Sequence, residues 1–353
     1  MLLDRETLDL TQGIEAILAA VPDAWHGQVK HELFQSVLEI ATKPCRTVTE
    51  AIDQLIELRI MVAEVAEGEG MTIGAAGTHP FARWQDQAIV DSERYEDVVA
   101  ELGYIARREL IFGMHVHVAI EGADRAIYVA DGIRRYLPLL LALSANSPFW
   151  AGVRTGIMST RTPVFRAFPR VGIPPHYGTW EIYSGRVEKM MESGAIEDYS
   201  FLWWDVRPHP NLGTVETRVF DQPTRIEDTR TLVALTVALA HSMVRLFDAG
   251  EPLVEQPGEL IDDNKVRAAV RGMAGELVDF HYGTHVPAPA LASRLLGVID
   301  EDAVALGCGA LLEGVHELAG TGTGALWQLE IAQRNGGDLR ALVREIVSRT
   351  RPV

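Results

Sequence analysis

The feature that most constrains the fold is a run of strict alternation at residues 112–120. Every second residue is apolar, and His115 and His117 occupy positions between the apolar ones. Because successive side chains of a strand point to opposite faces, this pattern predicts a strand with one buried and one polar face. Two histidines on such a face could bind a metal ion, or they could simply be exposed positions of a half-buried sheet.

A second alternation covers residues 214–220. Glu216 and Arg218 share one face, while Val215 and Val219 share the other. This segment is predicted to be a second strand, and in an antiparallel sheet the two polar faces would lie together. A rigid platform for binding and a plain exposed face explain the pattern equally well.

Helical patterns surround these strands. Residues 47–68 place apolar side chains at helical spacing, and residues 91–107 do the same, although Gly103 makes the end of that helix uncertain. From about residue 225 onward the chain is predicted to be mostly helical. Strands early and helices late favour an α+β architecture over a doubly wound α/β fold.

Composition limits the partners and the compartment. A net charge of -17 argues against nucleic acid or an anionic membrane surface as the main partner. The two cysteines, Cys45 and Cys308, are far apart, so a disulfide framework is not expected and a reducing cytoplasm fits. The apolar run at residues 231–247 is interrupted by His241 and Arg245, which favours a core helix over a membrane span. The N-terminus lacks the basic and apolar regions of a secretory signal.

An irregular segment at residues 147–177 is too long for a simple connector and is typical of a binding loop or lid. It carries Arg154, Arg161, Arg166 and Arg170 in an otherwise acidic chain. The sequence has no G-x-x-x-x-G-K-[ST] loop, so ATP phosphates would have to be held by metal ions and arginines. Such an arginine cluster can neutralise a transferring phosphoryl group, although a GC-rich genome would also enrich arginine.

Two carboxylates bracket the string ELFQSVLE, namely Glu32 and Glu39. Near a bend or a strand end they would suit Mg²⁺, which prefers oxygen ligands. In a helix they would merely face solvent, and from the spacing alone the helical alternative is the better one. Trp203 and Trp204 are likewise as consistent with core packing as with ligand binding.

Several strings occur together in a consistent order from about Leu2 to the region of Asp279. They are ELFQSVLEIAT, GTHPFARW, FGMHVHVAI, LPLLLALSANSPFW, STRTPVF, WWDVRPHP, GTVETRVFD and NKVRAAVRG. As a set, these strings resemble the carboxylate-amine ligases of the glutamate-cysteine ligase type 2 family.

The resemblance implies one glutamine-synthetase-like domain over residues 1–353, in which an antiparallel sheet has helices packed on one face. It implies ATP and Mg²⁺ as cofactors and an amide-forming reaction that passes through an acyl phosphate. The family label gives L-glutamate and L-cysteine as substrates and γ-glutamylcysteine as product, while other small-molecule carboxylates and amines are also possible. A cytoplasmic homodimer is expected.

Site residues follow from the same resemblance. Glu32 and Glu39 are expected to bind one Mg²⁺, and His115 and Glu216 a second, with Arg218 facing the γ-phosphate. Two further arginines of the irregular segment, Arg161 and Arg166, are expected to be catalytic. The residues expected to bind substrate or ATP are Thr78, His79, Arg170, Trp204 and Arg207.

One departure leaves alternatives open. Members of the resembled family begin with a strand carrying a Gly-x-Glu-Glu-Glu motif, just before the stretch that here reads LLDRETLDL, and this sequence starts after it. The resemblance therefore implies that part of the metal cage is missing, through a misassigned start, a truncation or the loss of ligase activity in a paralogue. A non-catalytic binding protein is one alternative. A zinc amidohydrolase, which would use His115-x-His117 on a strand, is another.

Overall fold

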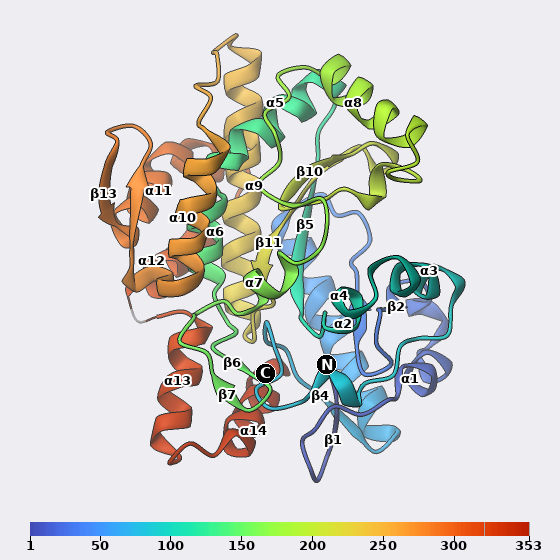
Figure 1. Cartoon of the computed structure of the whole chain (residues 1–353). Coiled ribbons are helices and arrows are strands. Elements are labelled where there is room, and N and C mark those ends of the chain that lie inside the picture. Colours follow the sequence, from blue (N-terminus) through green and yellow to red (C-terminus); the bar gives the residue numbers. More distant parts are fainter. Residues whose placement is uncertain (321, 353) are drawn as a thin grey trace.

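A three-stranded antiparallel sheet lies at the centre of the molecule (Figure 1). The computed structural model describes residues 1–320 and 322–352, apart from the side chain of Arg94. The strand order is β10 (Val206–His209), β11 (Thr214–Asp221) and β5 (Gly113–Ala119). Both predicted strands are confirmed, β5 and β11 being direct neighbours.

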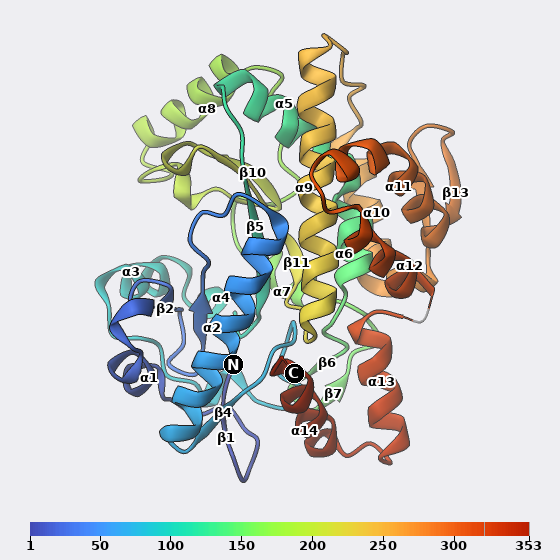
Figure 2. The ribbon, with the colours of Figure 1, turned by 180° about the vertical axis from the view of Figure 1, so that it is seen from behind.

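The apolar face of this sheet packs against helices. The string LPLLLALS forms α6 (Leu137–Ser144), whose eight residues are all buried between β11 on one side and α10 on the other. A helix that is apolar all round is stable only when it is enclosed in this way. Next to it run α9 (Ile226–Asp248), which contacts β5, and α2 (Val48–Gly68), which contacts α9 and confirms the predicted N-terminal helix (Figure 2). Helices therefore cover one face of the sheet, as expected.

Helix α9 is the one helix of the described residues that is long and apolar enough to cross a membrane. More than half of its apolar stretch is buried inside the protein, where α9 contacts α5 (Ala123–Ile133) and α11 (Ala288–Ala305). The prediction of a core helix over residues 231–247 is confirmed.

The C-terminal third is mainly helical, as predicted. Its remaining helices are α10 (Gly258–Arg271), α12 (Glu313–Gly320), α13 (Gly324–Arg334) and α14 (Leu339–Thr350). The prediction missed a hairpin formed by β12 (Glu276–Asp279) and β13 (Thr284–Pro287). Strands of four residues are too short to show an alternating period within a helical context.

The N-terminal part is built from two small antiparallel pairs and short helices. Its elements are β1 (Leu2–Asp4) paired with β4 (Met71–Ile73), β2 (Val29–His31) paired with β3 (Leu38–Ile40), and α1 (Ile14–Ala20), α3 (Glu93–Leu102) and α4 (Tyr104–Arg107). Gly103, at φ 52°, separates α3 from α4, which explains the uncertain helix end. Glu32 and Glu39 lie in the β2–β3 hairpin, so the helical alternative for ELFQSVLE is wrong.

Residues 147–177 contain no long regular element. They hold β6 (Phe149–Trp150), β7 (Val153–Arg154), α7 (Arg161–Phe165) and β8 (Val171–Gly172), and α8 (Trp180–Glu192) and β9 (Trp203–Trp204) follow. The mixture of helices with small antiparallel sheets confirms the α+β class. A zinc amidohydrolase would require strands repeated in a β/α pattern, and the central sheet is antiparallel.

We expect Leu140→Ala to lower the free energy of unfolding by about 2–5 kcal/mol, because it opens a cavity between the sheet and α10. Leu140 is 0% exposed. The matched control is Leu212→Ala, since Leu212 is 60% exposed and its truncation should change stability by less than about 0.5 kcal/mol. Urea unfolding followed by circular dichroism measures both, and equal effects would contradict the assignment of α6 as the centre of the core.

Candidate active site

A row of ionisable side chains crosses the polar face of the sheet. Arg207 on β10, Glu216 on β11 and His117 on β5 are direct cross-strand neighbours. Arg207 Nε donates to Glu216 Oε2 at 2.7 Å, and His117 Nε2 lies 3.6 Å from Oε1. The Glu216 side chain is only 2% exposed, so its negative charge is held inside the protein by these partners.

Arg218 and His115 complete the group around Glu216. Arg218 Nη1 donates to Glu216 Oε1 at 2.5 Å and lies 3.3 Å from His115 Nδ1. The β5–β11 register shifts between Thr217 and Phe220, and a bulge of this kind changes the direction of the side chains within it.

Asp205 holds that irregular stretch of β11 in place. Its carbonyl oxygen accepts a hydrogen bond from the Arg218 backbone N–H at 2.7 Å. Its buried carboxylate accepts one from Lys265 Nζ of α10 at 2.5 Å. The backbone position of Arg218 therefore depends on a buried ion pair to a helix of the C-terminal third.

The charges of the cluster determine its protonation. Burial by itself raises the pKa of Glu216, but Arg218, His115 and Arg207 together hold it well below its usual range. Burial and the charge of Arg218 lower the pKa of His115 far below its ordinary value, and burial also lowers that of His117. Near neutral pH the site thus holds an ionised carboxylate beside two neutral imidazoles, which can accept protons or bind metal.

The β2–β3 hairpin brings two further carboxylates to this face. Burial and the negative charge of Glu39 raise the pKa of Glu32 to about 7, while the charge of Arg218 opposes the rise. The two carboxyl groups are close enough to hydrogen-bond each other. Lys30 Nζ lies 3.6 Å from Glu39 Oε1 and partly balances the pair.

Glu109, in the loop between α4 and β5, was not among the residues predicted from the sequence. Burial and the charge of Glu32 raise its pKa to about 8, whereas Arg161 and Arg218 act in the opposite direction. Glu109 therefore lies beside the same cluster. It falls outside the alternating segment and in no recognisable motif, so no sequence signal pointed to it.

Arg161, on α7, lies against the backbone of β11. Its Nη2 donates to the carbonyl oxygen of Arg218 at 3.2 Å, and its side chain is buried. The approach is possible because position 113 is glycine, where an added Cβ would lie 2.4 Å from Arg161 Nη2. Among the described residues, the Nε atoms of Arg161 and Arg218 are buried without a hydrogen-bond partner, so each is an unsatisfied donor beside the cluster.

Asp221, also not predicted as a site residue, holds this region together and is 0% exposed. Its Oδ2 accepts hydrogen bonds from the Asn146 backbone N–H at 2.8 Å and from Ser147 Oγ at 2.7 Å. Its Oδ1 accepts one from Ser159 Oγ at 2.8 Å. Because Ser147 Oγ in turn accepts from the Arg161 backbone N–H, Asp221 fixes the start of α7.

Thr78 and His79 use their polar groups within the fold. Thr78 Oγ1 donates to the carbonyl oxygen of Phe149 at 2.7 Å. His79 Nε2 donates to the carbonyl oxygen of Leu8 at 3.0 Å and Nδ1 accepts from the Ala82 N–H at 2.9 Å. Burial lowers the pKa of His79 to about 3, so the ring is a neutral structural bridge. Their predicted roles in binding ATP or substrate gain no support from these contacts.

Three other predicted residues have partners away from Glu216. Arg166 forms an ion pair with Asp262 of α10 at 2.6 Å on the surface. Arg170 Nε donates to the carbonyl oxygen of Phe201 at 3.1 Å. Trp204 packs with a satellite apolar cluster around α8. The structure therefore brings together Glu32, Glu39, His115, Arg161, Arg207, Glu216 and Arg218, but not Arg166, Arg170 or Trp204.

The sequence model described as Glutamate-cysteine ligase family 2 (GCS2) matches residues 3–345. The chain belongs to the glutamate-cysteine ligase family 2. A Rubrobacter xylanophilus protein named "Putative glutamate--cysteine ligase 2-1" is 42% identical over 99% of this chain and 93% of its own length. A Sorangium cellulosum protein named "Putative glutamate--cysteine ligase 2" is 38% identical over the same shares.

The fold is also similar to that of a solved structure. The crystal structure of the glutamate–cysteine ligase of Francisella tularensis in complex with AMP superimposes with a TM-score of 0.70 over 100% of this chain and 87% of that chain, at 14% identity. Family membership makes the chain an ATP-dependent carboxylate-amine ligase. The geometry described above is therefore that of a glutamate-cysteine ligase family 2 member.

Of the two predicted Mg²⁺ sites, the arrangement of the carboxylates suits one and not the other. The carboxylates of Glu32 and Glu39 repel each other, and this repulsion helps to raise the pKa of Glu32. A divalent cation bound between them would remove the repulsion, so this pair fits Mg²⁺. Both carboxylate oxygens of Glu216 accept hydrogen bonds from arginines and are not free to bind a cation. Glu216 with His115 therefore does not fit Mg²⁺ in this arrangement. Within the described part of the chain, no group of three His, Cys, Asp or Glu residues could hold a metal ion. Mg²⁺ at Glu32 and Glu39 would therefore need phosphate oxygens and water as its other ligands.

The raised pKa of Glu109 gives a pH dependence of stability. With a folded pKa of about 8 against an ordinary 4.5, the folded ligase keeps a proton that the unfolded chain loses in this interval. The free energy of unfolding of the wild type should therefore fall as pH rises from about 5 to 8, and that of Glu109→Gln should fall less. The measurement is urea unfolding without divalent cations across that range. Glu57→Gln on the exposed side of α2 is the charge-matched control, and identical slopes in wild type and Glu109→Gln would contradict the assignment.

Proposed function

We propose that this glutamate-cysteine ligase family 2 chain forms an amide bond on the polar face of β10, β11 and β5. ATP would phosphorylate a carboxylate to an acyl phosphate, and an amine would then displace phosphate. The observation that carries the proposal is the buried Glu216 clamped by Arg207 and Arg218, with the Glu32 and Glu39 carboxylates close to Arg218.

Phosphoryl transfer depends mainly on positioning and on the neutralisation of charge. Arg161 and Arg218 each have a buried Nε–H without a protein acceptor, and these groups would donate to the transferring phosphoryl oxygens. Glu216 holds the Arg218 guanidinium in place, so it acts as a positioning residue in this scheme. Mg²⁺ bound at Glu32 and Glu39 would supply positive charge next to the phosphate oxygens.

The second step needs a proton acceptor for the attacking amine. His117 is neutral near pH 7 and lies on the polar face, and its pKa is lowered less far than that of His115, so His117 is the imidazole that would take that proton. No side-chain nucleophile is required, because the acyl phosphate is itself the activated intermediate.

L-glutamate and L-cysteine are proposed as substrates, giving γ-glutamylcysteine, ADP and phosphate. The support is the family assignment and the names of the relatives, since no residue of the site identifies a thiol. A glutamine-synthetase-like arrangement, a cytoplasmic location and a homodimer stay predictions from the resemblance.

The proposal predicts ADP release with Mg²⁺ and ATP for at least one carboxylate and amine pair in a panel that includes glutamate with cysteine. Arg218→Lys keeps the positive charge but loses Nε, and should lower kcat by about 10²-fold or more. Arg267→Met is the matched control, since among the described residues Arg267 pairs with Asp263 alone, at the surface of α10. Unchanged kcat in folded Arg218→Lys would contradict the site. No ADP release with any pair would favour the binding-protein alternative.

The carboxylate pair predicts pH-dependent Mg²⁺ binding. Because Glu32 has a pKa of about 7, cation binding must displace its proton, and Mg²⁺ affinity should rise between pH 6 and 8. Isothermal titration with MgCl₂ and ATP in two buffers of different ionisation enthalpy measures affinity and proton release together. Glu39→Gln should weaken binding at least about tenfold, whereas Glu57→Gln should not. Equal affinity in both variants would rule out this pair as the cation site.

A further inference from the structure

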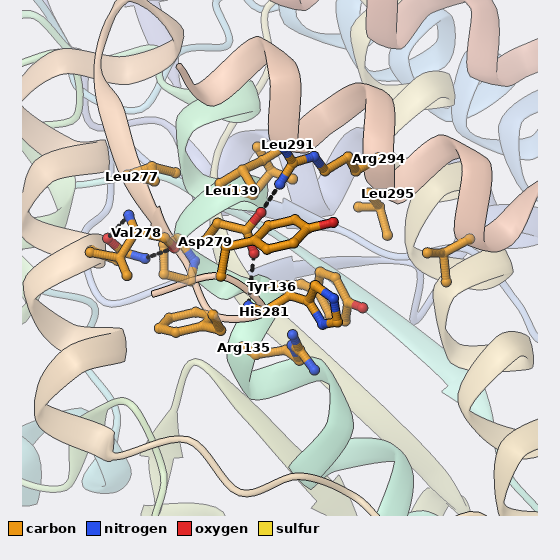
Figure 3. A pocket seen from close by; sticks show the side chains of 15 residues that line it. Arg135, Tyr136, Leu139, Leu277, Val278, Asp279, His281, Leu291, Arg294 and Leu295 are labelled. Atoms are coloured by element: carbon orange, nitrogen blue, oxygen red, sulfur yellow. Dashed lines mark hydrogen bonds and ion pairs between the residues drawn. The ribbon is translucent and has the colours of Figure 1, made fainter. Parts of the chain in front are cut away.

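A cavity lies away from the polar sheet face. It has a volume of about 290 Å³, is partly open to solvent, and is lined by residues of α6, α10, α11 and the β12–β13 hairpin (Figure 3). None of its lining residues belongs to the cluster around Glu216. At about 30 Å³ per water, this volume equals about ten water-sized groups.

Its walls are mainly apolar. Leu139 of α6, Leu277 of β12 and Leu291 and Leu295 of α11 form the sides. Aromatic rings lie at the edge, including Tyr282, which is 64% exposed in the turn of the hairpin. A cavity of this composition favours the apolar body of a small ligand.

Apart from the His281 ring, four charged or amide side chains line the cavity, and all but one of them have partners among the described residues. Asn264 is bonded to the backbone of Val278 through both its amide atoms, at 2.9 and 2.7 Å. Asp279 forms an ion pair with Arg294 and accepts a hydrogen bond from the His281 backbone N–H. These side chains thus do not need a ligand.

Arg135 is the exception. Its guanidinium lies 5.5 Å from the centre of the Tyr136 ring, and Figure 3 shows it on the other side of the cavity from Arg294. Across the described residues no carboxylate lies within ion-pair distance of Arg135. In a chain with a net charge of -17, an uncompensated guanidinium beside an apolar cavity is a local attraction for an anion.

The neighbouring cavity narrows the choice of ligand. It measures about 210 Å³, shares Arg135, Tyr136 and Val298 with the first cavity, and is lined by Glu251 and Glu255. Three carboxylates, those of Asp131, Glu251 and Glu255, face the guanidiniums of Arg134 and Arg135 there, so this lining is net negative. A negatively charged ligand would therefore keep its body in the first cavity. One guanidinium matches one carboxylate in its paired hydrogen-bond geometry, whereas a dianionic phosphate would call for more positive charge.

We propose that the cavity between α6, α10, α11 and the β12–β13 hairpin is a second ligand site of the protein. It takes a small apolar monocarboxylate of about ten non-hydrogen atoms, with its body against the leucines and its carboxylate on Arg135. The site is separate from the amide-forming face and does not depend on the function proposed there.

The test is isothermal titration of the full chain with 3-phenylpropionate, octanoate and the neutral 3-phenylpropanamide. We expect saturable binding of at least one acid, with the amide at least about tenfold weaker than the matching acid, because a charge-assisted hydrogen bond is lost. The two acids distinguish an aromatic from an aliphatic body. Absence of saturable binding by both acids would overturn the proposal, as would equal affinity for 3-phenylpropionate and its amide.

Variants locate the binding. Arg135→Met should weaken binding of the acid at least about tenfold without changing the affinity for the amide, and Leu291→Trp should abolish both by filling the cavity. Arg267→Met removes the same charge from the surface of α10 and should have no effect. Arg218→Met should also retain binding, because its guanidinium lies on the polar sheet face. Loss of binding in Arg218→Met, with retention in Arg135→Met, would place the acid at the ligase site and overturn the proposal.

Discussion

The buried carboxylate of Glu216 is the interaction on which the arrangement of the site depends. An ionised group in this position is tolerated only because Arg207 and Arg218 hold both of its oxygens, so the three side chains stabilise one another. Each arginine comes from a different stretch of the sheet, and the pairing fixes how those stretches present their donors. Removal of any member leaves part of the buried charge of the others uncompensated.

A second buried carboxylate, Asp221, stands five residues further along the same strand. It collects hydrogen bonds from Ser147 and Ser159, which belong to the irregular segment, and thereby positions α7 and Arg161. Strand β11 therefore positions all three arginines. Glu216 on its polar face holds Arg207 and Arg218, and Asp221 at its end holds the loop that carries Arg161. A segment without long helices or strands is held rigidly by a few hydrogen bonds to a buried charge.

Much of this could be predicted from the sequence, for physical reasons. The strand at residues 112–120 was recognisable because one of its faces is buried, and burial imposes a period of two. Strand β10 gave no such signal because it has four residues and contains Pro208. Glu109 was missed since its surroundings come from distant parts of the chain. His79 was expected from the family resemblance to bind ATP or substrate. A sequence does not show that the backbone groups of Leu8 and Ala82 already hydrogen-bond its ring.

The close approach of Arg161 to Gly113 has a consequence for how this site can vary among proteins. The guanidinium occupies the space that any other residue at position 113 would fill with its first side-chain carbon. The two positions are therefore linked by volume, although they are 48 positions apart in the sequence. A relative with a larger residue at the position of Gly113 would have to move or replace this arginine, so the size of one strand residue restricts where positive charge can stand.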